Sequence, residues 1–178
     1  MLFALTRRVL VETRPKVLAK FVYNFGVKGV RSVELHKRRR RRNENFPPFL
    51  FISVISSCQL RCQGCWVDVA APSQRLSLDE LNRIIGDAKA HGNAYFGILG
   101  GEPFLHPQLL DLFAAHPDCY FQVFTNGQLI TDDIARRLAE LGNVTPLISI
   151  EGSEIVSDER RGRAQVLTKT LEGLQACR

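Results

Sequence analysis

Apolar residues between positions 49 and 178 recur in two alternating patterns, short continuous runs and helically spaced sets. The runs are rich in Phe, Ile, Val and Leu and predict four strands, at residues 49–56, 95–99, 120–124 and 146–150. The spaced sets predict four helices, from Ser77 to Gly92, Pro107 to Ala115, Thr131 to Gly142 and Arg163 to Ala176. Ser77 and Glu80 predict a capping box, and Thr131 predicts a cap. In the last helix the residues expected to point inward are Val166, Leu167, Leu171 and Leu174. Four strand–helix units in series predict an α/β fold with a parallel sheet and right-handed crossovers.

Residues 1–45 differ from the rest of the chain in pattern and in charge. They contain 13 Lys or Arg and 3 Asp or Glu, whereas residues 46–178 contain 11 and 15. Helical spacing predicts two short helices separated at Pro15, from the apolar set Val9, Leu10, Val17, Leu18, Phe21, Val22 and Phe25. We expect a basic, partly helical N-terminal arm at residues 1–45 and a separate domain at residues 46–178.

The run from Lys37 to Arg42 contains only basic residues. Such a block repels itself, and three interpretations stay open: a solvated and uninvolved face, contact with an anionic membrane surface, or contact with nucleic acid. No aromatic residue is interleaved with these charges, which argues against nucleic acid.

The distribution of apolar residues and cysteines predicts a cytoplasmic protein. No apolar run reaches the roughly 18 residues of a membrane span. The apolar residues 1–5 precede Arg7 and Arg8, which reverses the order found in a signal peptide. The cysteine count of five is odd, with three in one short loop, unlike a secreted disulfide framework. Cys119 and Cys177 stand alone, and Cys119 is expected to be a buried apolar side chain.

An unusual motif follows each predicted strand. These motifs are the cysteine loop after the first strand, Gly-Gly-Glu-Pro at 100–103, Thr-Asn-Gly at 125–127 and Glu-Gly at 151–152. Because the carboxyl ends of parallel strands share one edge of a sheet, we expect all four motifs on one rim.

The first loop offers three thiolates, from Cys58, Cys62 and Cys65, in Cys-x3-Cys-x2-Cys spacing. Thiolates are the usual ligands of iron–sulfur clusters, and three ligands on a four-iron cluster leave one iron open to an exogenous molecule. Zinc is the main alternative, but structural zinc takes four ligands, usually in two separated pairs, and the sequence has no second pair.

The cysteine spacing after a first strand, followed by Gly-Gly-Glu-Pro after a second, resembles the radical SAM superfamily from about Phe49 to Arg178. The resemblance implies a partial (βα) parallel barrel in which Cys58, Cys62 and Cys65 hold a [4Fe–4S] cluster whose fourth iron binds S-adenosylmethionine (SAM). It also implies an enzyme. An electron from a donor such as a flavodoxin or ferredoxin would cleave SAM, and the 5′-deoxyadenosyl radical would take a hydrogen atom from the substrate.

The resemblance further implies roles for the later loops. The Gly-Gly-Glu loop would meet the SAM amino group, a Ser and an acid after the fourth strand would approach the ribose, and an Arg would pair with the SAM carboxylate. The residues expected to bind SAM on this basis are Gly100, Gly101, Glu102, Asn126, Ser149, Glu151 and Arg161. Ordinary turns and a solvated charge cluster are the alternatives for these motifs.

The chain departs from the family pattern beside the third cysteine. The family usually has an aromatic residue there that helps hold the adenine, whereas this chain has Gly64 before Cys65 and Trp66 after it. Trp66 is expected either to stack on the adenine or to lie in the core.

A core of the radical SAM type continues to about six strand–helix units, and this chain ends after the fourth. The fourth strand would then be an exposed edge. Three explanations are open: a fragment of a longer protein, a second chain that completes the barrel, or an inactive remnant that acts as a binding module. The sequence does not predict the substrate.

Overall fold

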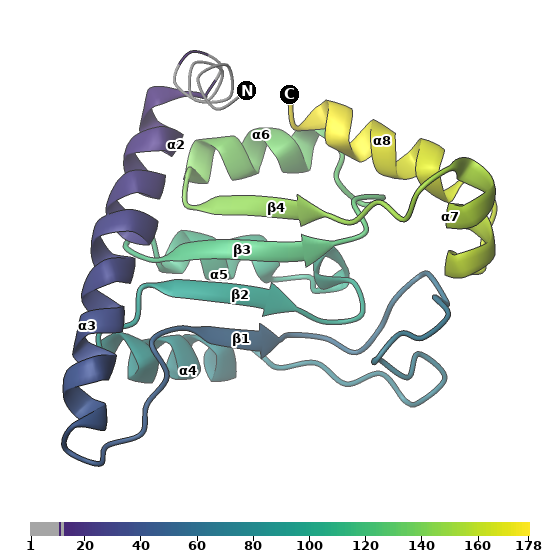
Figure 1. Cartoon of the computed structure of the whole chain (residues 1–178). Helices are drawn as coiled ribbons and strands as arrows, with labels where there is room; N and C mark the ends of the chain where they lie inside the picture. Colours follow the sequence, from purple (N-terminus) through teal and green to yellow (C-terminus); the bar gives the residue numbers. More distant parts are fainter. Residues whose placement is uncertain (1–10, 12) are drawn as a thin grey trace.

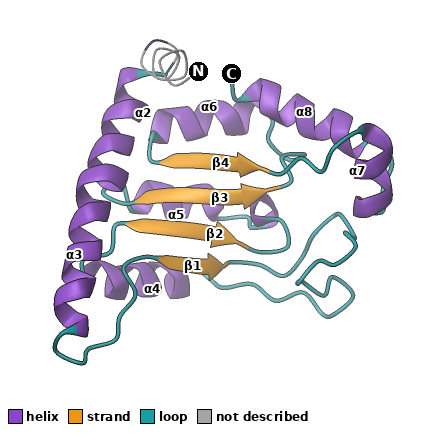
Figure 2. Cartoon of the chain, in the orientation of Figure 1, coloured by secondary structure: helices purple, strands orange, loops and turns teal. Residues whose placement is uncertain are grey.

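The computed structural model describes Val11 and residues 13–178, and its centre is a sheet of four parallel strands (Figures 1 and 2). The strands are β1 (Leu50–Ser53), β2 (Tyr95–Leu99), β3 (Tyr120–Thr125) and β4 (Val144–Ile148), in the order β1-β2-β3-β4. Phe121 of β3 pairs with Phe96 of β2 on one side and with Val144 of β4 on the other. The predicted parallel sheet is confirmed.

The strand boundaries follow the sequence pattern closely, with one correction. β2 has the predicted bounds, β3 extends by Thr125, and β1 is shorter than the apolar run. The predicted start of the fourth strand at Pro146 was wrong, because β4 begins at Val144 and ends at Ile148. Proline lacks an amide donor but is tolerated inside an edge strand, so Pro146 marks no boundary.

Helices α4 (Leu78–Ala90), α5 (Leu109–Ala115) and α6 (Asp132–Leu141) cover one face of the sheet (Figure 2). Between these layers lies a continuous apolar core of strand residues such as Phe96 and Phe121 and helix residues such as Leu81, Ile85 and Phe113. The opposite face, among the described residues, exposes Phe51 and Leu147. Helices therefore cover one face of the sheet, and the other face is exposed among the described residues.

The ends of the helices follow local sequence signals. Ser77 and Glu80 form the expected capping box, in which the Ser77 amide donates to Glu80 Oε2 at 2.8 Å and the Glu80 amide donates to Ser77 Oγ at 3.3 Å. Thr131 Oγ1 accepts from the Ile134 amide at 3.3 Å, and α6 ends at Gly142 with a φ of +69°.

Three further helical segments complete the domain: η2 (Pro103–Leu105), α7 (Glu154–Arg161) and α8 (Val166–Ala176). α7 was not predicted, and the last helix begins at Val166 rather than at Arg163. Leu171, expected to point inward, is exposed, so the helical spacing of α8 was misread at that position.

A long helix crosses the amino ends of the strands (Figure 1). It consists of α2 (Pro15–Lys20), a π-helical turn η1 (Phe21–Val27) and α3 (Lys28–Arg40). The predicted break at Pro15 coincides with the start of α2, where proline is tolerated. Val9 and Leu10 of the preceding predicted helix lie outside the described residues. After Pro15 the helix is longer than predicted and includes most of the basic run.

Within the part of the chain that is described, no helix combines the length and the apolarity that crossing a bilayer requires. The phenyl rings of Phe21 and Phe25 pack edge-on against Tyr120 and Tyr95, with centroids 5.3 and 5.1 Å apart. The helix is thereby joined to the amino ends of β3 and β2.

Candidate functional site

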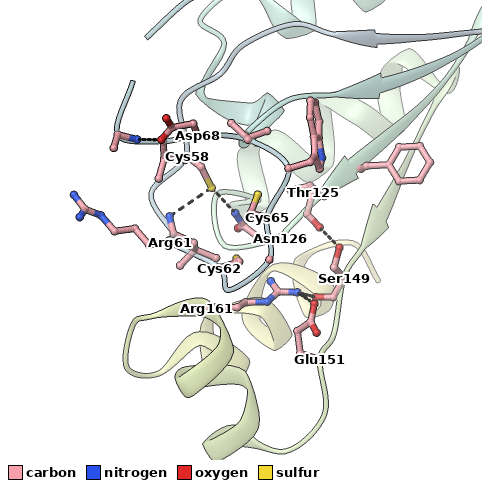
Figure 3. Close-up of a pocket in the computed structure, with 18 residues that line it drawn as sticks. Cys58, Arg61, Cys62, Cys65, Asp68, Thr125, Asn126, Ser149, Glu151 and Arg161 are labelled. Carbon is pink, nitrogen blue, oxygen red and sulfur yellow. Dashed lines mark hydrogen bonds and ion pairs between the residues drawn. The ribbon is translucent and has the colours of Figure 1, made fainter. Parts of the chain in front are cut away.

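The carboxyl ends of the strands surround an open pocket of about 710 Å³ (Figure 3). The three loop cysteines all line it, with Cys58 and Cys62 half-buried and Cys65 exposed. The other predicted residues that line it are Trp66, Gly101, Asn126, Ser149, Glu151 and Arg161. The structure thus brings residues from four separate loops to one place.

The cysteine loop turns back on itself between its second and third cysteines. The Cys65 amide donates to the Cys62 carbonyl at 3.2 Å, and Gly64 has a φ of +72°. This left-handed conformation disfavours any residue with a Cβ, which accounts for glycine where the family usually has an aromatic residue. Trp66 is 69% exposed and lines the pocket, so the alternative that placed it in the core is wrong.

The unpredicted helix α7 fixes the cysteine loop. The amides of Arg61 and Gln63 donate to the carbonyls of Arg161 and Arg160, at 3.2 and 2.7 Å. A Cβ on Gly162, which ends α7 with a φ of +65°, would lie 3.1 Å from the Arg61 carbonyl oxygen. The end of α7 therefore lies directly against the loop that carries the thiols.

The Gly-Gly-Glu loop packs against the exit of β1. A Cβ on Gly100 would lie 2.6 Å from the Ile55 carbonyl oxygen, and one on Gly101 would lie 2.8 Å from that of Ser56. The Gly101 amide donates to the Ile55 carbonyl, and the Glu102 amide to that of Ser57, both at 2.8 Å. Only glycine permits this approach of two backbones.

Glu102 is fully buried behind the pocket rather than lining it. Its Oε2 accepts from the Asn126 amide at 2.9 Å, and its Oε1 accepts from Thr125 Oγ1 at 2.8 Å and the Phe104 amide at 3.1 Å. Burial raises the pKa of Glu102, while these hydrogen bonds oppose the rise. Its carboxylate is already satisfied by the protein, and the contact with SAM expected of it stays a prediction.

Asn126 is held from three sides. Besides the bond from its amide to Glu102, its Oδ1 accepts from Gln59 Nε2 at 3.0 Å and its carbonyl accepts from Thr170 Oγ1 at 2.9 Å. Its Nδ2 points at Cys58 Sγ, 3.9 Å away (Figure 3). Asn126 thus presents a fixed amide donor beside the first thiol.

Arg161 is 4% exposed, which excludes the solvated charge cluster for this residue. Its Nη2 donates to the Ser149 carbonyl at 2.9 Å and approaches Glu151 Oε1 at 3.4 Å (Figure 3). Ser149 Oγ donates to the Thr125 carbonyl at 3.3 Å, so its hydroxyl ties β4 to β3. The guanidinium therefore stands at the pocket wall with one carboxylate near it.

The surroundings of the pocket disfavour the thiolate form of two of the loop cysteines, Cys58 and Cys62. Burial raises the pKa of Cys58, and burial likewise raises that of Cys62, although Arg161 acts against the rise at Cys62. Thiolate ligation would therefore release protons as the metal enters.

The spacing of the thiols argues against a single zinc ion. Zinc–sulfur bonds of about 2.3 Å in a tetrahedron bring sulfur atoms to about 3.8 Å from one another. Among the described residues, only His116, Asp118 and Cys119 bring three such ligand atoms within 4.8 Å, and Asp118 is already paired with Lys89 at 2.9 Å. The three loop thiols are not gathered within that distance, so they form no preformed three-ligand site of zinc dimensions.

A model of the radical SAM superfamily matches residues 52–178, which is most of the chain. The chain belongs to the radical SAM superfamily. Members of this superfamily are enzymes that use a [4Fe–4S] cluster and SAM. The pocket fits both groups, because it combines three thiols from one loop with a buried guanidinium and an oriented amide that can meet the charged end of SAM.

Individual relatives support the assignment over part of their length. An AdoMet-dependent heme synthase of Methanosarcina barkeri is 27% identical over 139 residues, covering 75% of this chain and 40% of the synthase. A GTP 3′,8-cyclase of Microcystis aeruginosa is 30% identical over 144 residues, covering 72% of this chain and 43% of the cyclase. The chain spans less than half of the length of these relatives.

Solved structures agree on the fold. The crystal structure of Streptococcus suis SuiB bound to S-adenosylmethionine superposes with a TM-score of 0.65 at 23% identity, over 82% of this chain and 36% of SuiB. The neighbouring radical SAM structures contain a partial barrel, so the predicted fold class is confirmed.

Three residues have structural roles at the site that the sequence pattern did not predict. Gln59 and Thr170 fix Asn126, and Asp158 accepts from the amides of Gln165 and Val166 at 2.9 and 2.8 Å and so caps α8. The glycine at position 162, following a charged segment that begins at Ser153, was the available signal for α7.

Proposed function

We propose that this chain binds a [4Fe–4S] cluster through Cys58, Cys62 and Cys65 and cleaves SAM reductively as part of a radical SAM enzyme. The observation that supports the proposal most directly is the convergence of three thiols, Asn126 and the buried Arg161 on one pocket. When bound, the reduced cluster and SAM supply a 5′-deoxyadenosyl radical that abstracts hydrogen from a substrate.

The protein residues hold and orient the cofactor. Arg161 is positioned to pair with the SAM carboxylate, because its guanidinium is buried and its ion pair with Glu151 is long, at 3.4 Å. Glu151 and Ser149 lie where the SAM ribose is expected, and Trp66 is free to cover the adenine.

We assign Gly100, Gly101 and Glu102 a shared role in shaping the wall beside the SAM amino group. The two glycines permit the approach to the cysteine loop, and Glu102 positions Asn126 through its amide. Asn126 Nδ2 in turn faces Cys58 Sγ, where a hydrogen bond would stabilise a thiolate ligand.

The open side of the pocket suits delivery of an electron. Cys65 and Arg61 are both exposed there, so a one-electron donor such as a flavodoxin or ferredoxin can approach the cluster edge. Thiols must stay reduced for this chemistry, and this requirement supports a cytoplasmic location.

The open edge of β4 is where the barrel would continue. Within the described residues β4 pairs only with β3, and Leu147 on it is exposed. We infer that further strands, from the same polypeptide or from a second chain, cover this edge in the active enzyme.

The test is anaerobic reconstitution with iron and sulfide, followed by incubation with SAM and dithionite. We expect about four irons and four sulfides per chain and the formation of 5′-deoxyadenosine. Cys62→Ser should lower the iron content to near zero, whereas the matched change Cys177→Ser, at an exposed cysteine away from the pocket, should leave it unchanged.

Two results would count against the proposal. One is a zinc-only protein with no bound iron after reconstitution. The other is a fully loaded cluster with no 5′-deoxyadenosine, even with a strand-completing partner supplied, which would support an inactive binding module.

A further inference from the structure

Besides the rings of Phe21 and Phe25, four cationic side chains join the long helix α2–η1–α3 to the domain. Lys16 Nζ donates to the Glu140 carbonyl at 2.5 Å, Lys20 Nζ to the Leu141 carbonyl at 2.7 Å, and Lys28 Nζ to the Asp118 carbonyl at 2.7 Å. The Arg39 guanidinium donates to the His91 carbonyl. These carbonyls lie at or just beyond the ends of α6, α5 and α4, where helices present unpaired acceptors and partial negative charge.

The buried middle of this helix is also polar. Asn24 donates to the carbonyls of Pro117 and Cys119, both at 3.4 Å, and Ser32 Oγ donates to the Pro48 carbonyl at 2.5 Å. Asn24 and Ser32 are the two fully buried side chains of the helix. The face turned toward the domain therefore combines polar anchors with the aromatic rings of Phe21 and Phe25.

The opposite face is apolar and exposed. Val22, Val27 and Val30 are 53%, 57% and 72% exposed, and Tyr23 between them is exposed as well. A surface helix of a water-soluble domain normally turns its apolar stripe inward and its charges outward. Here Phe21 and Phe25 do face the domain, but a second apolar stripe, Val22, Val27 and Val30, faces outward. Val30 lies at its edge and borders an apolar hollow that Phe49 and Phe51 also line.

The apolar stripe continues into the basic run. Helical spacing places Val30, Lys37 and Arg41 on one side of the helix, since seven and eleven residues correspond to about two and three turns. Lys37, Arg38, Arg40, Arg41 and Arg42 are all exposed. One surface thus joins valines to a dense cluster of cations.

We propose that this surface, Val22, Val27, Val30 and the basic run Lys37–Arg42, binds the face of an anionic membrane. The valines would enter the interface between headgroups and acyl chains, and the cations would contact anionic headgroups. The charge of the surface favours a membrane over a protein partner. Five exposed cations beside an apolar stripe complement the many anionic headgroups of a bilayer.

This mode of binding orients the domain. The helix crosses the amino ends of the strands, whereas the cysteine pocket lies at their carboxyl ends (Figure 1). A domain attached through the helix would hold its pocket away from the bilayer, open to an electron donor in solution.

The test is flotation of the full chain with lipid vesicles. We expect binding to phosphatidylcholine vesicles with about 30% phosphatidylglycerol to exceed binding to pure phosphatidylcholine at least about tenfold, and to fall when salt is raised to about 0.5 M. Replacing Arg38, Arg40, Arg41 and Arg42 by Gln should reduce the partition coefficient by at least about tenfold. The triple change Val22→Ser, Val27→Ser, Val30→Ser should reduce it several-fold.

Matched controls come from other exposed positions. Arg83→Gln with Arg137→Gln removes surface charge from α4 and α6, and Ile155→Ser removes an equally exposed apolar side chain from α7; both should bind as the parent does. Val22, Val27 and Val30 are each more than half exposed, so circular dichroism of the triple variant should show an unchanged fold.

Three outcomes would overturn the proposal: no binding to either vesicle, equal binding to both, or binding that the controls weaken as much as the stripe variants do. A concentration-dependent dimer that the valine triple variant abolishes would also overturn it, because a second copy of the chain would then cover the stripe.

Discussion

At the carboxyl ends of the strands, polar side chains from four loops face a shared pocket. At the amino ends, polar side chains of one long helix face main-chain carbonyls instead. Arg161 and Lys20 illustrate the contrast. Arg161 is buried in the pocket wall, where its guanidinium can donate to a ligand in the pocket. Lys20 instead donates to a carbonyl at the end of α6. A cationic side chain is thus available to bind a ligand at the carboxyl ends, whereas at the amino ends it attaches the helix to the domain.

This difference predicts that substitutions at one end of the strands affect mainly function, and substitutions at the other end mainly stability. A change at the pocket should alter SAM binding more than folding, and a change under the helix should do the reverse. The following variants are ordered from the largest expected effect to the smallest.

Arg161→Met should weaken SAM binding by about 10- to 150-fold, the equivalent of about 1.5–3 kcal/mol for a lost charged hydrogen bond. The iron content should stay near that of the parent, because Arg161 is not a ligand. Arg160→Met is the matched control, since its exposed side chain also pairs with Glu151, at 3.1 Å. Equilibrium dialysis with labelled SAM measures both, and equal losses would refute the special role of Arg161.

Gly173→Ala should destabilise the domain by about 1–3 kcal/mol, because the added Cβ would collide with the Gly127 carbonyl oxygen and push α8 from the Asn126 loop. Gly86→Ala in α4 meets nothing within 4 Å and should stabilise by about 0.5–1 kcal/mol. Urea unfolding of the two variants should therefore shift in opposite directions. Shifts in the same direction would show that α8 does not depend on this close approach.

Asn24→Leu should cost about 1 kcal/mol of unfolding free energy, since two buried carbonyls lose a long hydrogen bond each. SAM binding should be unchanged, because Asn24 lies at the opposite end of the strands from the pocket. A variant with full stability and weakened SAM affinity would break the separation of the two ends.

The smallest expected effect is a pH dependence at His116, near the helix. Burial lowers the pKa of His116, with Lys89 acting in the same direction and Asp118 against them. The unfolded chain then takes up a proton below about pH 6.5 that the folded chain resists, so stability should fall as pH drops from that value. His116→Gln should remove this part of the slope in urea titrations between pH 7 and 5, and an unchanged slope would contradict the assignment.

Local signals explain which parts of the fold were predictable. β2 and the caps at Ser77 and Thr131 depend on adjacent residues, and the structure has them as predicted. α7 was missed because its apolar residue Ile155 faces outward while its buried residues are Ser157 and Arg161, which reverses the usual helical pattern.

The long helix was predicted from the same apolar spacing, but its orientation was not. Spacing identifies an apolar set without saying where each member points: Phe21 and Phe25 pack against the domain, whereas Val22 faces outward. At the site, residue type and spacing pointed to the cysteines, and the family resemblance pointed to Arg161. The burial of Glu102 depends on how three loops pack together, which no local pattern records.

The central claim is that one iron of the cluster has no protein ligand and binds SAM. The direct measurement is the electron paramagnetic resonance spectrum of the reconstituted, dithionite-reduced chain, recorded with and without SAM. The account predicts a [4Fe–4S] signal whose g-values change when SAM is added, with Arg161→Met requiring more SAM for the same change. A full cluster whose spectrum is identical with and without saturating SAM would contradict it.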